Sequence, residues 1–162
     1  MEMNEWHDFF VATAGSAAAL TGLIFVGVSI NIEKILSVAK LPDRALLSLA
    51  LLLNILIISS LMLIPMQTYI MIGIEVLVIA IGMYIFVTKM DIDIYKKTDS
   101  QYKKQLLRSL IFNQLAILPY VAAGIAIFIC KEDGLYWIVP GIIISFIKSV
   151  IDAWVLLVEI NR

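Results

Sequence analysis

The chain has 162 residues, of which 62% are hydrophobic and 15% are charged, with a mean hydropathy of +0.99 and a net charge of −1. Soluble domains average about 45–50% apolar and about 25% charged residues, so this composition excludes an ordinary soluble fold and indicates a membrane protein. The lack of a basic excess argues against a nucleic-acid partner, and the single cysteine, Cys130, excludes an internal disulfide and a CxxC redox or metal site.

The first apolar segment covers residues 9–32 and follows an N-terminus that carries no Lys or Arg. Because it lacks the positive region of a cleavable signal, we expect this segment to be retained as a membrane-spanning helix. The segment carries a row of small residues, namely Ala14, Gly15, Ala18, Ala19 and Gly22. Such rows let helix backbones approach closely in lipid, so the row predicts packing against another helix of this chain or of a neighbour. Lining a pore is the alternative.

Four more apolar segments follow, at residues 45–66, 68–89, 106–129 and 135–159. Each is close to the length of about 20 residues that crosses a hydrocarbon core of about 30 Å. The residues from Pro65 to Thr68 predict a tight hairpin between the second and third segments, and Asp133 with Gly134 predicts a turn before the fifth. We therefore expect a single all-α domain over residues 1–162, a polytopic membrane protein with five transmembrane helices.

The basic residues predict the orientation of these helices. Three Lys or Arg residues lie in the loop near 33–44 and six lie near 89–108, whereas the loop at 130–134 carries only Lys131. Loops rich in Lys and Arg remain in the cytoplasm, and five spans place both basic loops on the same side. The N-terminus is then expected outside and the C-terminus in the cytoplasm.

The fifth segment has one polar face. At about 100° per residue, Gly141, Ser145, Lys148, Ser149 and Asp152 share that face, and apolar residues occupy the other. Lys148 and Asp152 are four residues apart and can touch. Because a charge at the bilayer centre costs about 2.5–3.5 kcal/mol, the face predicts either a hydrated ion path or an intrahelical pair buried for packing specificity.

Other spans offer polar groups that could face this stripe. Asn54 is predicted near the depth of Lys148, and Asn113 and Gln114 near the depth of Asp152. Glu75 is predicted nearer the outer surface, within reach of the stripe if the helices tilt. For the three amides the alternative is ordinary hydrogen bonding between helices, worth about 0.6 kcal/mol each.

Three stretches carry a resemblance to a group of known proteins: WHDFFVATAGSAAALTGLIFVGVSINIEKIL, DRALLSLALLLNILIISSLMLIPMQ and DAWVLLVEI. They resemble small multi-spanning bacterial membrane proteins that are mostly uncharacterised. Some of those are labelled as modulators of a membrane-anchored AAA protease. The resemblance implies the bacterial cytoplasmic (inner) membrane and a membrane-protein partner, and it brings no catalytic or ligand residues.

The sequence does not carry the motifs of an enzyme. It has no HExxH and no P-loop, and its one histidine, His7, lies outside the spans, so we expect no enzymatic activity, no cofactor and no metal site. The predicted function is a homo-oligomer in the lipid bilayer that forms an ion channel lined by the polar face of the fifth helix, since short chains build paths around a symmetry axis. The alternative is a non-conducting regulatory or scaffold subunit that binds a membrane protein such as a protease.

Overall fold

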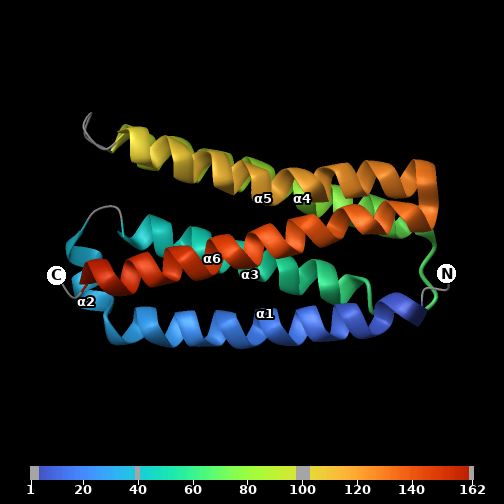
Figure 1. Ribbon diagram of the computed structural model, residues 1–162, viewed down its shortest axis with the longest axis horizontal. Helices are drawn as coiled ribbons and strands as arrows, with labels where there is room; N and C mark the ends of the chain where they lie inside the picture. The colour runs from blue at the N-terminus through green and yellow to red at the C-terminus, as the bar shows by residue number, and fades with distance from the viewer. Residues whose placement is uncertain (1–3, 39–40, 98–102, 161–162) are drawn as a thin grey trace.

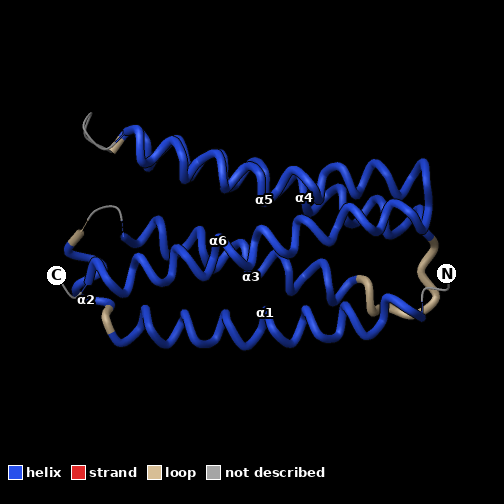
Figure 2. Tube along the Cα trace, in the orientation of Figure 1, coloured by secondary structure: helices blue, strands red, loops and turns tan. Residues whose placement is uncertain are grey.

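The computed structural model describes residues 4–38, 41–97 and 103–160, and within these ranges the chain is helical and has no strand (Figure 1). This confirms the predicted all-α class. The elements are α1 (Asn4–Ile30), α2 (Ile32–Ser37), α3 (Leu41–Leu61), α4 (Tyr69–Lys96), α5 (Lys103–Cys130), the 3-10 helix η2 (Lys131–Trp137) and α6 (Ile138–Ile160). Short connections join them (Figure 2). The remaining parts of the predicted domain lie outside the described residues.

Two helix boundaries differ from the sequence prediction for identifiable reasons. α3 ends at Leu61 instead of residue 66, because a residue before proline disfavours helical backbone and Pro65 follows Ile64. The hydroxyl of Thr68 then caps α4 by accepting a hydrogen bond from the Met71 amide at 3.3 Å. α4 runs to Lys96, seven residues past the predicted end at 89, and this extension buries Asp91 and Ile94.

The connection between α5 and α6 is more compact than a simple turn. Residues Lys131–Trp137 form η2, which packs against α5. A Cβ atom added to Gly134 would lie 2.4 Å from the Ile127 nitrogen, so only glycine permits this contact. The predicted turn at Asp133 and Gly134 is therefore a docked helical segment, and α6 begins at Ile138.

Among the described residues, four helical segments are long and apolar enough to cross a membrane. They are Trp6–Ile30, Leu41–Leu61, Tyr69–Lys96 and Leu106–Leu156. The last has 51 residues and contains most of α5 and α6, which fold back on each other through η2. These segments are typical of a multi-pass membrane protein.

The helices form three layers (Figure 1). The α4–α5 hairpin makes one layer, α3 and α6 lie side by side in the middle, and α1 packs beneath them against α3. α6 contacts α3 within its own layer and α5 in the neighbouring layer. This central position encloses the polar face of α6.

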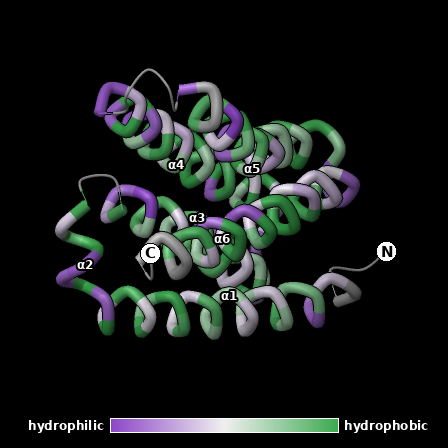
Figure 3. The backbone as a smooth tube through the Cα atoms, turned by 60° about the vertical axis from the view of Figure 1, so that its left-hand side comes forward, coloured by the Kyte–Doolittle hydropathy of each residue, from purple (hydrophilic) through white to green (hydrophobic). Residues whose placement is uncertain are grey.

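The described parts of the two basic regions, namely α2 with the start of α3 and the end of α4, lie at the same end of the bundle (Figure 1). Lys97, at the end of α4, is 2.8 Å from the Asp43 carboxylate at the start of α3. Hydrophilic residues colour α2 and the end of α4, whereas hydrophobic residues dominate the lengths of the helices (Figure 3). The bundle therefore has a basic end, defined by α2, the start of α3 and the end of α4, and an opposite end at η2.

The small-residue row of α1 does not pack within this chain. The face of α1 that meets the bundle instead carries Phe10, Thr13 and Ala17, all buried. Ala18 and Ala19 are exposed, Ala14 is half-buried, and a Cβ atom added to Gly15 or Gly22 would meet nothing within 4 Å. Among the described residues, no helix of the same chain therefore packs closely on the row. Packing against a neighbouring chain stays a prediction.

Two glycines mark a close approach between α4 and α5. A Cβ atom on Gly124 would lie 2.9 Å from Leu77 Cβ, and one on Gly73 would lie 3.4 Å from the Gly124 carbonyl oxygen. Two isolated glycines, rather than a repeated row, therefore bring these two backbones together.

Candidate functional site

The polar face of α6 points into the bundle. Ser145 and Ser149 are fully buried, and Lys148 and Asp152 are 6% and 8% exposed. The opposite face is exposed, with Ile147, Ile151 and Trp154 pointing away from the bundle. Helices α3 and α5 of the same chain cover the polar face, so its enclosure does not need a second copy.

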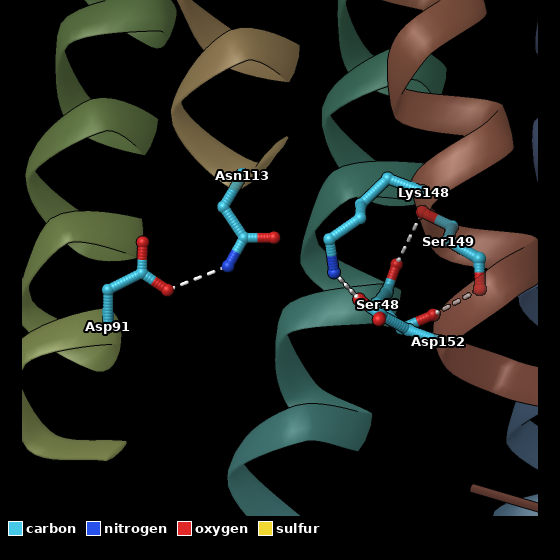
Figure 4. Close-up of polar contacts among 6 residues, drawn as sticks. All are labelled: Ser48, Asp91, Asn113, Lys148, Ser149 and Asp152. Atoms are coloured by element: carbon cyan, nitrogen blue, oxygen red, sulfur yellow. Dashed lines mark hydrogen bonds and ion pairs between the residues drawn. The ribbon is translucent and has the colours of Figure 1, made fainter. Parts of the chain in front are cut away.

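Lys148 and Asp152 form the predicted ion pair across one helical turn (Figure 4). The ammonium group donates to the Asp152 carboxylate, and both side chains lie in the interior of the bundle. Each charge lowers the cost of burying the other, because an uncompensated charge in a low-dielectric interior is strongly unfavourable. This pair is the centre of the candidate site.

Two serines join α6 to α3 beside the pair, since Ser149 lies between Lys148 and Asp152 in the sequence. The Ser48 hydroxyl donates to the Ser149 carbonyl oxygen at 3.0 Å, and the Ser149 hydroxyl donates to the Ser48 carbonyl oxygen at 3.2 Å (Figure 4). Both residues are fully buried. The reciprocal bonds satisfy both hydroxyl groups and fix the register of the two helices.

A second buried acid faces the same layer from α4. Asp91 is 4% exposed, and its carboxylate accepts hydrogen bonds from the Asn113 amide at 2.7 Å and the Gln114 amide at 3.3 Å. Gln114 also donates to the Thr88 hydroxyl at 3.2 Å. The two predicted amides therefore come together, and their partner is an acid that the sequence analysis placed in a loop.

A small cavity connects the two acidic groups. It has a volume of about 10 Å³, and its lining includes Arg44, Asp91, Asn113, Lys148 and Asp152. The Asn113 amide oxygen has no hydrogen-bond partner among the described residues and points toward the side of Lys148 (Figure 4).

A third polar layer lies one to two turns above Lys148. The Tyr120 hydroxyl lies 3.5 Å from the Ser145 hydroxyl, which donates to the Ala116 carbonyl oxygen at 3.4 Å. Gly141 permits this arrangement, since a Cβ atom there would lie 2.9 Å from the Tyr120 ring. The fully buried Asn54 amide interacts with Tyr120 and makes no hydrogen bond of normal geometry within the described chain.

We call these layers together the polar column. It comprises Ser48, Asn54, Asp91, Asn113, Tyr120, Ser145, Lys148, Ser149 and Asp152. Beyond it toward η2, the Thr13 and Ser59 hydroxyls meet at 2.9 Å between α1 and α3. From Ser48 to Ser59 the rise along α3 is about 16 Å at about 1.5 Å per residue, roughly half of a hydrocarbon core of about 30 Å.

Glu75 lies apart from the polar column. It sits near the start of α4, toward the η2 end of the bundle, and accepts a hydrogen bond from Gln67 at 2.8 Å. Gln67 belongs to the connection between α3 and α4, so this contact stays local to the hairpin. Among the eight predicted polar site residues, Glu75 is the one that the structure separates from the others.

No family model, no curated protein and no solved structure matches this chain. What the site can do must therefore follow from its own residues.

The column contains one ion pair, one further carboxylate, two amides and four hydroxyl groups, all buried within a membrane-type bundle. Within the described residues, no cluster of three or more His, Cys, Asp or Glu side chains lies close enough to hold a metal ion. The chemistry on offer is proton exchange and hydrogen bonding, since each hydroxyl can both donate and accept.

Three members of the column were not predicted from the sequence: Ser48, Asp91, which accepts from Asn113, and Tyr120, which contacts Ser145. Asp91 carried a usable signal. The sequence MDIDIYK continues the helical pattern after Lys89, and a buried acid needs donors such as the two amides of α5. Ser48 and Tyr120 gave no comparable signal, since single hydroxyl groups in apolar spans are common.

Proposed function

We propose that this protein is an ion pathway of the bacterial cytoplasmic membrane, in which the polar column carries protons through the interior of one chain. The observation that carries this proposal is the buried Lys148–Asp152 pair facing a second buried acid, Asp91, across a shared cavity. Ionisable groups inside membrane spans are costly and commonly mark ion paths and proton relays.

The proposal includes five membrane crossings, through α1, α3, α4, α5 and α6. The shortest of these helices, α3, has 21 residues and a length of about 32 Å, enough to cross a core of about 30 Å. The basic end of the bundle is assigned to the cytoplasm by the positive-inside rule. The N-terminus then lies outside and the C-terminus lies in the cytoplasm.

The size of the column favours protons over larger ions. The cavity beside Lys148 has a volume of about 10 Å³, which corresponds to about one water molecule. The rest of the path consists of packed hydroxyl groups, Ser48 with Ser149 beside the pair and Tyr120 with Ser145 about one turn away. A hydrated metal cation does not fit between such groups, whereas a proton can move along hydroxyl groups and single waters. The unpaired amide of Asn54 supplies a further water-binding group at this level.

Proton flux in liposomes tests this proposal. Purified protein is reconstituted with a pH-sensitive dye inside, and flux is followed under an imposed voltage. Asp152→Asn removes the charge with little change in shape and is expected to slow the flux at least about tenfold, equivalent to about 1.4 kcal/mol in the barrier. Asp133→Asn, an exposed acid in η2, is the matched control and should leave the flux unchanged.

Two results would count against the pathway. A proton flux equal to that of protein-free liposomes at every voltage and pH would show that the protein does not conduct protons. If Asp152→Asn conducted protons as fast as the wild type, the ion pair would not belong to the proton path and would serve packing alone.

The exposed face of α1 favours a second candidate, a non-conducting regulatory or scaffold subunit. Gly15 and Gly22 have open space around them, and Ala18 and Ala19 are exposed. Rows of this kind let a partner helix approach closely, whether from a second copy in a homo-oligomer or from a membrane protein such as a protease.

Association in mild detergent separates the two candidates. Under the scaffold proposal, the wild-type chain is isolated with a stoichiometric partner or as a homo-oligomer, and Gly22→Leu releases it, whereas Leu23→Ala beside it does not. A strictly monomeric chain without a partner would exclude the scaffold while leaving the proton pathway intact.

A further inference from the structure

A groove opens on the side of the bundle between α5 and α6, next to the small cavity beside Asp91, with which it shares Arg44, Ser109, Lys148 and Asp152. It has a volume of about 320 Å³. Its apolar walls come from Phe112 and Leu115 on α5 and from Ile147 and Ile151 on α6, all exposed on the surface that would face lipid. Arg44 and Arg108 lie along the groove together with the Lys148–Asp152 pair. We call this feature the lateral groove.

The lateral groove has the length of one lipid leaflet. Its α6 wall runs from Ile144 to Val155, a rise of about 16 Å at about 1.5 Å per residue. One leaflet contributes about half of a hydrocarbon core of about 30 Å. An acyl chain that enters from the membrane surface therefore matches the groove in length.

The charge of the groove is concentrated at one end. Arg108 lies near the start of α5 and Arg44 near the start of α3, so both belong to the basic end of the bundle. Deeper in the groove Lys148 is paired with Asp152, and this pair contributes no net charge. Arg108 is the main candidate for binding an anionic group, because its side chain is exposed and accessible from the membrane surface.

We propose that the lateral groove binds one anionic phospholipid, with its phosphate held by Arg108 and Arg44 and one acyl chain lying between α5 and α6. Basic pockets between membrane-spanning helices near the cytoplasmic surface select anionic headgroups by charge. The apolar walls contact the acyl chain along its length, a contact that a soluble anion does not make. The site requires a membrane location and does not depend on proton conduction.

Lipid binding to the purified full chain tests the site directly. The protein in a mild non-ionic detergent is titrated with dioleoyl phosphatidylglycerol or with dioleoyl phosphatidylcholine, and bound lipid is counted by native mass spectrometry. We expect phosphatidylglycerol to bind more tightly. Arg108→Gln should weaken it about fivefold, the factor for about 1 kcal/mol per basic side chain, and leave phosphatidylcholine unchanged.

Two further variants separate charge from shape. Lys34→Gln removes an exposed charge on α2, at the same end of the bundle but outside the groove, and should change neither affinity. Leu115→Trp places a large side chain in the groove and should abolish retention of phosphatidylglycerol while Arg108 remains. Circular dichroism verifies that the Leu115→Trp variant keeps its helical content. If this variant does not fold, Arg108→Gln still tests the site, because it alters an exposed position.

Three results would overturn the proposal. Equal affinity for the two lipids would show that the arginines do not select an anionic headgroup. Displacement of phosphatidylglycerol by inorganic phosphate would assign Arg108 to a soluble anion instead. A dimer that Leu115→Trp dissociates, without any lipid preference, would assign the groove to a helix of a second copy.

Discussion

In α6 the polar side chains point into the bundle, with Ser145 and Ser149 fully buried and Trp154 on the opposite face 68% exposed. In α1 the direction is reversed for the small residues. Gly15 and Gly22 face outward with nothing near them, and the buried positions carry Phe10 and Thr13. Two helices of the same bundle thus use their distinctive residues on opposite sides.

The difference follows from the forces that act on each helix. A charged or hydroxyl group in lipid is costly, so the polar face of α6 must turn toward other helices or water. A glycine or alanine has no such cost in lipid, and its direction depends only on which helix approaches it. Polarity therefore fixes the rotation of α6, whereas packing geometry fixes that of α1.

Breaking the ion pair of α6 is expected to have the largest effect on stability. Asp152→Ala leaves Lys148 buried without its partner, and the loss of an ion-pair partner costs about 3–5 kcal/mol. The double variant Lys148→Met with Asp152→Leu removes both charges and should recover most of that loss. Unfolding free energies measured by denaturant titration in detergent micelles give both values.

A substitution on the opposite face of α6 is the matched control. Trp154→Leu alters an exposed position and should change the unfolding free energy by about 0.5 kcal/mol or less. If Asp152→Ala were equally mild, Lys148 would have to reach water in the folded protein, and the polar face of α6 would not be sealed inside the bundle.

The sequence predicted the helical class and the inward-facing residues of α6, because both depend on local composition and period. Their spacing of four residues allowed Lys148 and Asp152 to touch, and the structure pairs them. The same reasoning failed for Asp91, which lies among Lys89, Lys96 and Lys97 and therefore resembled part of a basic loop. Its burial depends on Asn113 and Gln114, which are more than twenty residues away in the sequence.

The helix contacts were harder to predict than the polar positions. A row of small residues marked α1 as a close-packing helix, yet the tight crossing lies at Gly73 and Gly124 between α4 and α5. Single glycines give no repeated pattern, and the choice of partner is made by the whole bundle. A sequence pattern can show that a helix is able to pack closely but cannot name its neighbour.

Glycine substitutions in α5 and α1 are expected to differ in their effect on the unfolding free energy, and the larger effect is intermediate in size. Gly124→Ala places a Cβ atom 2.9 Å from Leu77 Cβ and 3.0 Å from the Leu77 nitrogen, so α4 and α5 must move apart. Overpacking of this kind costs about 1–3 kcal/mol. Gly22→Ala meets nothing within 4 Å and should not destabilise the isolated chain. The same denaturant titration compares the two, and a clear loss of stability in Gly22→Ala would show that α1 is already covered by a neighbour.

A smaller effect is expected from the serine contact between α3 and α6. Ser149→Ala removes the hydrogen bond from its hydroxyl to the Ser48 carbonyl oxygen and leaves the reciprocal bond intact. Hydrogen bonds between membrane helices average about 0.6 kcal/mol, so each single alanine variant should lose about that amount. A double-mutant cycle with Ser48→Ala measures the coupling. Strict additivity would mean that the two bonds form independently and do not act as one clamp.

The smallest effect is expected at the exposed ion pair between Lys97 and Asp43, the counterpart of the buried pair in α6. The Lys97 ammonium donates a hydrogen bond to the Asp43 carboxylate, and this bond raises the pKa of Lys97 above its ordinary value of 10.5. Because the folded-state pKa is the higher one, the stabilisation is complete below pH 10.5 and is lost as the pH rises through the folded-state value. Lys97→Gln should therefore lower the melting temperature slightly at neutral pH and not at strongly alkaline pH. Salt should shrink the difference as well, since the screening length falls from about 10 Å at 0.1 M to about 3 Å at 1 M. A difference that persists in high salt would place this contact, like Lys148 and Asp152, beyond the reach of solvent.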